Sequence, residues 1–259
     1  MPSLALATIC HDPEGRLIET AQRLLPHLAP LFDGIALQAS QTTKKGMLEQ
    51  IQSLGGVTQR DDEDGYAVLL GKKRRDAVTL ALSLETSHVL YVDFDRLLHW
   101  FEKYPDELEM TLNTVSQSDV TIIGRTPRAF ASHPRNMRET ESMVNHIFAL
   151  TTGHIWDMLA AARAFSRKAA QIIVDESKDD AISNDVSWPL LLLRKEGLSF
   201  DYLELNGFEY ETADRFANEI EVAGGLEGWL EGLEKDPKRW ATRLHYANLM
   251  TEAMKPYMR

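Results

Sequence analysis

The chain has 259 residues, of which 44% are hydrophobic and 26% are charged, and its formal net charge at pH 7 is −11. This composition is typical of a globular protein with one large domain, or one domain and a small addition. The acidic excess argues against a general nucleic-acid-binding protein, which needs a basic surface. The single cysteine, Cys10, excludes an intrachain disulfide and favours a reducing cytoplasm. We find no 18-residue apolar run and no charged-then-apolar leader, so we predict neither a membrane span nor a signal peptide.

Strand and helix patterns alternate through the first part of the chain. Residues 3–10 and 34–39 are predicted strands, and each is followed by an amphipathic helical pattern. Residues 59–65 are polar and are predicted to form a loop whose acidic run is solvated. Repeated strand-helix units of this length predict a largely parallel sheet with right-handed crossovers.

A helix predicted over residues 71–84 opens with a basic cluster, Lys72 to Arg75. Positive charge at a helix N-terminus is mildly unfavourable, which favours an anionic partner such as a diphosphate. Lys72 and Arg75 are therefore candidate phosphate ligands, and a solubilising helix start is the alternative.

The central stretch, residues 88–95, reads His-Val-Leu-Tyr-Val-Asp-Phe-Asp. Its apolar part predicts a strand buried on both faces, and Asp93 and Asp95 follow where the chain leaves that strand. In open α/β sheets, ligands bind just outside the carboxyl ends of the strands. Two carboxylates at this spacing can hold one hard divalent cation together with substrate phosphates, so we predict a Mn²⁺ or Mg²⁺ site. The alternative is an Asp N-cap for the helix that follows.

Three later segments follow this motif in an order that resembles a known family. The first is a predicted strand, Asp119 to Gly124, followed by Arg125. The others are a segment over 135–167 that ends in an Asp-and-Arg pattern, and an acidic helix over 184–197 that precedes a last strand over 198–205. In this order the chain resembles the GT-A nucleotide-diphospho-sugar transferases, and among them the glycosyltransferase family 2 enzymes similar to dolichyl-phosphate mannose synthase.

The resemblance implies an α/β fold with a mostly parallel, Rossmann-like sheet flanked by helices over residues 1–212, and a C-terminal helical appendage over residues 213–259. Trp229 and Trp240 are expected to anchor the appendage. It further implies a glycosyltransferase that moves a sugar, with inversion, from a nucleotide-diphosphate donor to an acceptor. We expect a soluble acceptor, because no membrane segment or basic amphipathic helix accompanies the arginine-rich residues 125–138.

The chemistry of such a transfer assigns further residues. The charge of the leaving diphosphate must be neutralised, which a metal on Asp95 and Asp93 would do as a Lewis acid. Guanidinium groups bind phosphate oxygens in a two-pronged manner. An inverting displacement also needs a carboxylate base, and Asp185 fits by position, with a helix N-cap as the alternative. The candidate arginines for the diphosphate are Arg125, Arg163 and Arg167.

The first two strands depart from the family. Its usual Pro-x-Tyr-Asn-Glu is replaced by Ile-Cys-His-Asp-Pro-Glu at 9–14, and its Asp-Asp-x-Ser by Leu-Gln-Ala-Ser at 37–40. Asp12 or Glu14 is a candidate to replace the missing carboxylate as a base or ribose partner, and loop capping is the alternative. Three histidines are candidates to complete the metal shell, with a structural role as the alternative: His99, His133 and His154.

Two other functions remain open. A strand ending in Asp-x-Asp also resembles the nucleophile motif of haloacid-dehalogenase-like phosphatases, with residues 178–180, Lys-Asp-Asp, as the later Lys and acidic pair. A GT-A-fold protein that binds a ligand without turnover is the second, since fold does not settle function. Finally, a methionine-rich C-terminal end, formed by Met250, Met254 and Met258, is a candidate homodimer contact.

Overall fold

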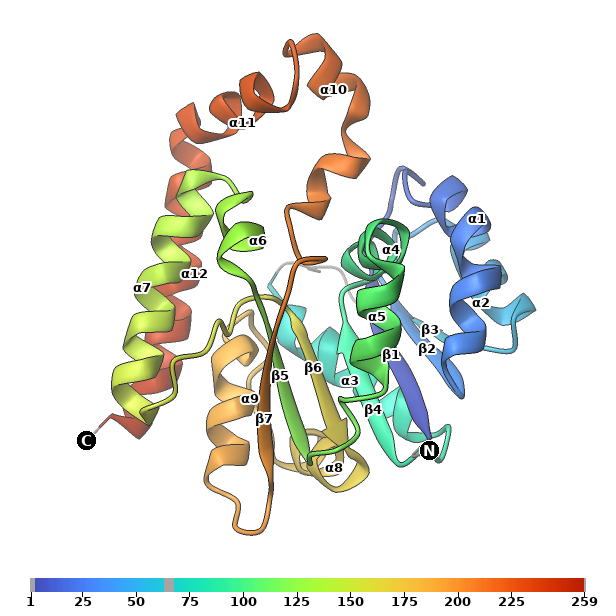
Figure 1. Ribbon diagram of the computed structural model, residues 1–259, viewed down its shortest axis with the longest axis vertical. Helices are drawn as coiled ribbons and strands as arrows, with labels where there is room; N and C mark the ends of the chain where they lie inside the picture. Colours follow the sequence, from blue (N-terminus) through green and yellow to red (C-terminus); the bar gives the residue numbers. More distant parts are fainter. Residues whose placement is uncertain (1–2, 63–67, 259) are drawn as a thin grey trace.

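The computed structural model describes residues 3–62 and 68–258. Within them, seven strands form one sheet (Figure 1). In chain order they are β1 (Leu4–Cys10), β2 (Gly34–Ala39), β3 (Val57–Arg60), β4 (His88–Val92), β5 (Val120–Arg125), β6 (Ala162–Ser166) and β7 (Phe200–Leu205). Their spatial order is β3-β2-β1-β4-β6-β5-β7. All neighbours are parallel except β6, which runs antiparallel to both β4 and β5.

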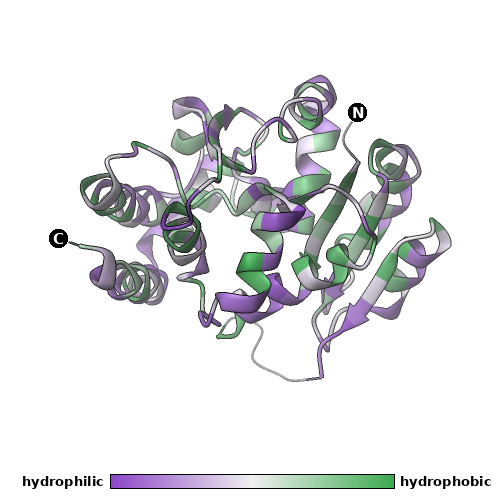
Figure 2. Cartoon of the chain, turned by 90° about the horizontal axis from the view of Figure 1, so that it is seen from below, coloured by the Kyte–Doolittle hydropathy of each residue, from purple (hydrophilic) through white to green (hydrophobic). Residues whose placement is uncertain are grey.

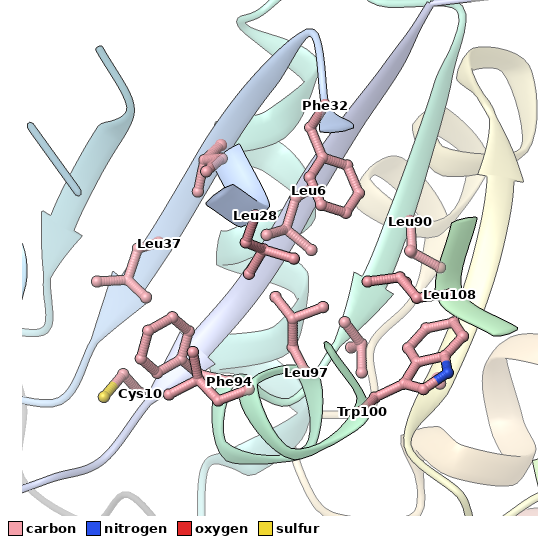
Figure 3. Close-up of a cluster of buried hydrophobic side chains, with 14 of the residues drawn as sticks. Leu6, Cys10, Leu28, Phe32, Leu37, Leu90, Phe94, Leu97, Trp100 and Leu108 are labelled. Carbon is pink, nitrogen blue, oxygen red and sulfur yellow. The ribbon is translucent and has the colours of Figure 1, made fainter. Parts of the chain in front are cut away.

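One face of the sheet packs against four helices. They are α1 (Ile18–Leu28), α2 (Lys45–Ser53), α4 (Phe94–Lys103) and α5 (Pro105–Leu112). Successive side chains of a strand point to opposite faces, so Leu4 and Leu6 of β1 enter this layer and Ala5 and Ala7 enter the other. Figure 3 shows part of this layer, where Leu97 of α4 lies among side chains from the strands and α1.

The other face packs against five helices. They are α3 (Leu70–Leu82), α7 (Arg135–Thr152), α8 (Arg167–Glu176), α9 (Asn184–Leu193) and α12 (Pro237–Met254). In Figure 2 the helices carry both hydrophobic and hydrophilic residues, as expected of helices with one side on a core. Short elements complete the described chain: η1 (Ala29–Leu31), α6 (Pro127–Ala131), η2 (Glu211–Arg215), α10 (Ala217–Val222), α11 (Leu226–Lys235) and η3 (Lys255–Tyr257).

The C-terminal helix α12 runs beside α7 and also contacts α9 (Figure 1). Met250 and Met254 of α12 are buried in the core of the second face, and of the three methionines proposed as a dimer contact only Met258 is exposed. The methionine-rich surface predicted for a homodimer is therefore not formed. Trp229 and Trp240 are only half-buried and lie outside both core clusters, so the core role predicted for them is wrong. The ring of Trp229 nevertheless contacts that of Tyr210, with the ring centroids 6.1 Å apart.

Two strands, β3 and β6, are not predicted from the sequence pattern. The first, β3, is a short edge strand with one aliphatic residue, and it overlaps the polar segment predicted as a loop; residues 63–65 of that segment lie outside the described residues. The second, β6, reads Ala-Arg-Ala-Phe-Ser and is central although an arginine lies inside it. The arginine-rich segment 125–138 is mostly helical, since α6 and the start of α7 occupy most of it. No helix in the described part of the chain combines the length and apolarity needed to cross a membrane.

Candidate functional site

A cavity of about 470 Å³ lies beyond the carboxyl ends of β1 and β4. Parallel strands direct these ends to one edge of the sheet, which is where ligands bind in open α/β folds. The antiparallel strand β6 begins at the same edge, because Ala162 is in register with Val92. Helices α7 and α12 supply the far wall. The cavity thus combines segments from the N-terminal half, the middle and the C-terminal end of the chain.

Asp93 lies at this edge, directly after β4, and lines the cavity. The Tyr91 hydroxyl donates to Asp93 Oδ1 at 2.5 Å, and Arg74 Nη2 donates to Oδ2 at 3.1 Å. About a quarter of the Asp93 side chain is exposed, at 26%. Asp93 is the backbone N-cap of α4, but its side chain makes no capping hydrogen bond. The carboxylate therefore faces the cavity, and the capping alternative raised for Asp93 is not realised.

Asp95 lines the same cavity from the first turn of α4. Its Oδ1 accepts from the backbone N–H of Arg96 at 3.0 Å, and its Oδ2 lies 3.1 Å from Arg215 Nη2. Its side chain is 20% exposed. Arg215 comes from η2, which follows β7, so the C-terminal part of the sheet domain supplies a cation to this end of the cavity.

Glu211 of η2 also lines the cavity and is buried. Arg96 Nη2 donates to its Oε1 at 2.9 Å and holds the side chain in place. Among the described residues, the second oxygen, Oε2, has no hydrogen-bond partner. An unpartnered carboxylate oxygen at a ligand-sized cavity is a group that a ligand hydroxyl would satisfy.

Asp185, at the start of α9, is buried and lines the cavity between two arginines. Arg74 Nη1 and Arg163 Nη2 each donate to its Oδ1 at 2.8 Å. Burial alone would raise the pKa of Asp185, but the charges of Arg74 and Arg163 outweigh burial and hold the pKa below its ordinary value. Asp185 is thus ionised, as a base must be, although the two guanidinium groups also weaken it as a proton acceptor.

The wall formed by α7 and α12 carries apolar and polar side chains in equal number. Met137 and Val144 of α7 and Met250 of α12 face the cavity together with Leu159. Polar side chains make up the other half of this wall. They include Glu141 of α7 and Arg243 of α12, whose closest charged atoms lie 3.8 Å apart, and Tyr246.

Several predicted ligands lie outside the lining of this cavity. Asp12 is buried and its two oxygens accept from the backbone N–H groups of Arg16 and Leu17, each at 2.9 Å, so it shapes the loop before α1. Glu14 is paired with Arg16. Asp12 therefore has the loop-capping role given as its alternative, whereas Glu14 forms an exposed ion pair.

Successive residues of a helix point in different directions, so the rotation of α3 about its axis decides which basic residue of the cluster over residues 72–75 reaches the cavity. Lys72 pairs with Asp76 at 3.1 Å and Arg75 with Asp180, and neither lines the cavity. Arg74 lies on the buried side of α3 and meets both Asp93 and Asp185. Arg74, and not Lys72 or Arg75 as predicted, is therefore the residue of this basic cluster that lines the cavity.

The three arginines predicted for the diphosphate are likewise elsewhere. Arg125 is buried between Glu141 and Asp157, at 2.8 and 2.7 Å, and does not line the cavity. Arg163 is buried behind Asp185. Arg167 follows the other end of β6, where its N–H donates to Ser87 O, because β6 is antiparallel to β4 and carries it to the opposite edge of the sheet.

None of the three histidines considered as metal ligands lines the cavity. His99 lines a neighbouring cavity and is paired with Asp214, with Nδ1 2.6 Å from Oδ2. Burial, together with the charges of Arg125 and Arg96, holds the pKa of His133 well below its ordinary value, and its Nδ1 donates to the carbonyl of Ala129. His154 stacks on Trp156.

The residues offered for a phosphatase reading are structural. Asp179 accepts from the hydroxyls of Ser183 and Ser187 at 2.9 and 2.7 Å, and Asp180 pairs with Arg75. Neither side chain lines the cavity, and neither does Lys178. The motif strand β4 is also the fourth strand of the chain rather than the first.

Comparison with known proteins identifies the fold. The glucosyl-3-phosphoglycerate synthase of Mycobacterium tuberculosis, in a complex with Mn²⁺, UDP-glucose and phosphoglyceric acid, matches with a TM-score of 0.52 and 10% identity over 78% of this chain and 69% of that one. Another structure of that synthase matches with a TM-score of 0.51 and 10% identity over 86% and 78%. A structure described as a mycobacterial protein gives 0.51 and 12% over 87% and 76%. No family model and no curated protein matches the sequence.

These matches and the sheet order establish the GT-A fold that the sequence predicted. The matched structures with a named activity reported above are of a glucosyl-3-phosphoglycerate synthase, so they do not support the finer resemblance to dolichyl-phosphate mannose synthase.

Proposed function

We propose that this protein is a nucleotide-sugar-dependent glycosyltransferase that works with Mn²⁺ or Mg²⁺. The observation that carries the proposal is that Asp93 and Asp95 both line one ligand-sized cavity at the carboxyl end of β4, beside the cations Arg74 and Arg215. The GT-A fold is compatible with a nucleotide-sugar donor, but a fold alone does not determine the reaction. Because matched structures hold UDP-glucose, a UDP-sugar is the first donor to test.

The two aspartates fit a divalent metal by their chemistry. Both are oxygen donors with part of the side chain exposed, and Mg²⁺ or Mn²⁺ typically takes one or two carboxylates together with substrate phosphates and waters. No further His, Cys, Asp or Glu completes a cluster of three around them within residues 3–62 and 68–258. The donor diphosphate would therefore supply the remaining ligands. When bound, the metal would neutralise charge on the leaving diphosphate.

The protein's own groups would bind the donor and take up the acceptor proton. Arg215 is placed beside Asp95, where a guanidinium can pair with phosphate oxygens. In an inverting transfer the acceptor oxygen attacks the anomeric carbon, the diphosphate leaves with the electron pair of the broken bond, and the hydroxyl proton passes to a carboxylate. Asp185, predicted from the sequence, and Glu211, found from the structure, are the two candidate bases. Glu211 is favoured because its Oε2 has no partner among the described groups.

A thermal-shift panel tests the donor site. Wild type is measured with UDP and UDP-glucose, each with and without Mn²⁺, beside Asp95→Asn and Arg167→Gln. A ligand at a hundredfold excess over its Kd stabilises a protein by about 2.7 kcal/mol. We expect a metal-dependent shift that Asp95→Asn abolishes and Arg167→Gln keeps, since Arg167 lies at the opposite edge of the sheet. Equal shifts in both variants, or none in wild type, would contradict the proposal.

The alternative of a binding protein without turnover is separated by product formation. If the metal-dependent thermal shift is seen but no UDP is released from UDP-glucose with any acceptor tested, the binding protein is favoured. Release of UDP that depends on the metal and on Asp95 would favour the transferase. Phosphatase activity has no support at this site, because the Lys-Asp-Asp segment over residues 178–180 does not reach the cavity.

A further inference from the structure

A second cavity, of about 390 Å³, adjoins the first along α12. Three residues line both cavities: Met137 of α7, and Arg243 and Tyr246 of α12. A small molecule can therefore extend from the side of Asp95 toward the N-terminal end of α12 without leaving the protein surface. The remaining lining of the second cavity comes from the start of α7, from the first half of α12 and its N-cap residue, from Leu233 of α11 and from Tyr210.

The second cavity is cationic. Lys238, Arg239 and Arg243 line it, against a single acidic residue, Asp236. The Oδ1 of Asp236 is engaged by the N–H of Lys238 as the cap of α12, and its Oδ2 is 3.9 Å from Arg239 Nε, at the limit of an ion pair. Two of these positive groups, Lys238 and Arg239, lie in the first turn of the 18-residue helix α12, where the helix dipole also favours an anion, and Arg243 lies one turn further along.

A buried amide provides an independent sign of a ligand. Asn136, in the first turn of α7, lines the second cavity and is 3% exposed. Its Oδ1 has no hydrogen-bond partner within the described part of the chain. A buried acceptor without a partner is costly, and a hydroxyl on a bound molecule would satisfy it.

We propose that the second cavity binds the anionic end of the acceptor, and that the acceptor is a small molecule with an oxyanion and at least one hydroxyl. Lys238 and Arg239 contact the oxyanion and Asn136 accepts from a hydroxyl, while the reacting hydroxyl extends past Arg243 and Tyr246 into the cavity of Asp93 and Asp95. The identification of the ligand as an acceptor rests on the proposed function. The presence of an oxyanion site does not.

Calorimetric titration tests the site, with UDP and Mn²⁺ saturating so that the donor cavity is filled. The probes are glycerol 3-phosphate, glycerate and inorganic phosphate, with glycerol as the uncharged control. The first two compare a phosphate with a carboxylate, and the third lacks a carbon-borne hydroxyl. We expect glycerol 3-phosphate or glycerate to bind and glycerol not to bind.

The variants are Lys238→Gln, Arg239→Gln and Asn136→Ala. Loss of one charge-assisted contact is expected to weaken binding of the anionic probe about tenfold in each of the first two. Lys235→Gln is the matched control, because Lys235 is a neighbouring exposed lysine that pairs with Glu231 and does not line the cavity. Asn136→Ala should weaken the hydroxylated probe and leave inorganic phosphate unchanged.

Each outcome decides between the proposals. If no anionic probe binds, or if Lys238→Gln and Arg239→Gln bind it as wild type does, the second site is wrong, whatever the donor panel gives. If Asn136→Ala weakens the binding of the hydroxylated probe and of inorganic phosphate equally, the proposed contact between Asn136 and a ligand hydroxyl is wrong. If an anion binds in the absence of UDP in a Lys238- and Arg239-dependent way while no nucleotide binds at all, the site stands and the glycosyltransferase proposal falls.

Discussion

Arg74 and Asp185, 111 residues apart in the chain, form a buried ion pair in which Arg74 Nη1 lies 2.8 Å from Asp185 Oδ1. The pair joins α3 to α9 at the cavity, which both side chains line. The other terminal nitrogen of the same guanidinium reaches Asp93 at 3.1 Å, so one side chain fixes the distance between two cavity carboxylates. The candidate site therefore depends on a buried polar network between helices on the sheet face that carries α3 and α9.

Removing Asp185 is expected to destabilise the fold. Asp185→Leu leaves the buried guanidinium groups of Arg74 and Arg163 without their shared carboxylate, and breaking such a pair from one side costs about 3–5 kcal/mol. Urea unfolding measures the change. The control Asp175→Asn alters an exposed residue of α8 and should stay within about 0.5 kcal/mol of wild type. If Asp185→Leu lowers the free energy of unfolding by less than about 1 kcal/mol, the network does not contribute substantially to stability.

Glu211 and Asp185 are separated as candidate bases by kinetics. Loss of a general base lowers the rate by about 10²- to 10⁴-fold. We expect Glu211→Gln to lower kcat by this factor with little change in the KM for the donor, and to flatten the acid side of the pH–rate profile. Asp185→Asn, measured well below its own Tm, should act mainly on KM through Arg74. The reverse pattern would return the base role to Asp185.

Gly207 is predicted to tolerate no side chain. A Cβ at this position would lie 2.1 Å from Trp100 Cδ1, and Trp100 is fully buried with its Nε1 donating to Glu107 at 3.1 Å. Gly207→Ala should cost at least the 1–3 kcal/mol typical of overpacking, about as much as a small cavity in the core. Gly232→Ala is the control, because Gly232 lies inside α11 with open space around it and alanine there should stabilise by about 0.4–1 kcal/mol. Scanning calorimetry of the two variants gives opposite shifts in Tm if both arguments hold.

The pH dependence of stability should carry a contribution from His99. Burial acts to lower the pKa of His99, but the hydrogen bond and charge of Asp214, with Glu211 and Glu209, outweigh it and raise the pKa above 6.5. A raised pKa in the folded state means that the interaction is fully present below about pH 6.5 and is lost as the pH rises through the folded value. The free energy of unfolding of wild type relative to His99→Gln should therefore fall with rising pH. A difference that is constant across this range would contradict the ion pair.

The strand pattern and the Asp-x-Asp motif were readable because both are local. Strand-helix alternation and runs of β-branched residues predict β1, β2, β4 and β5. Ligands bind beyond the carboxyl ends of strands in open α/β sheets, and Asp93 and Asp95 do line the cavity there. The short edge strand β3 and the alanine-rich β6 gave no such signal. For β6 the burial of Arg163 is made possible by Asp185, which is 22 residues away.

Hydrophobic periodicity and chain order are enough to predict the α/β class and to put Asp93 and Asp95 at the end of a strand. Which charged side chains meet the cavity depends instead on packing between distant segments. The rotation of α3 about its axis directs Arg74 to the cavity rather than Lys72 or Arg75. The antiparallel course of β6 carries Arg167 to the far edge, and the chain after β7 brings Glu211, Arg215 and α12 to the site. A charged side chain is positioned by the packing of the element that carries it and by partners distant in the chain, and the neighbouring residues in the sequence specify neither.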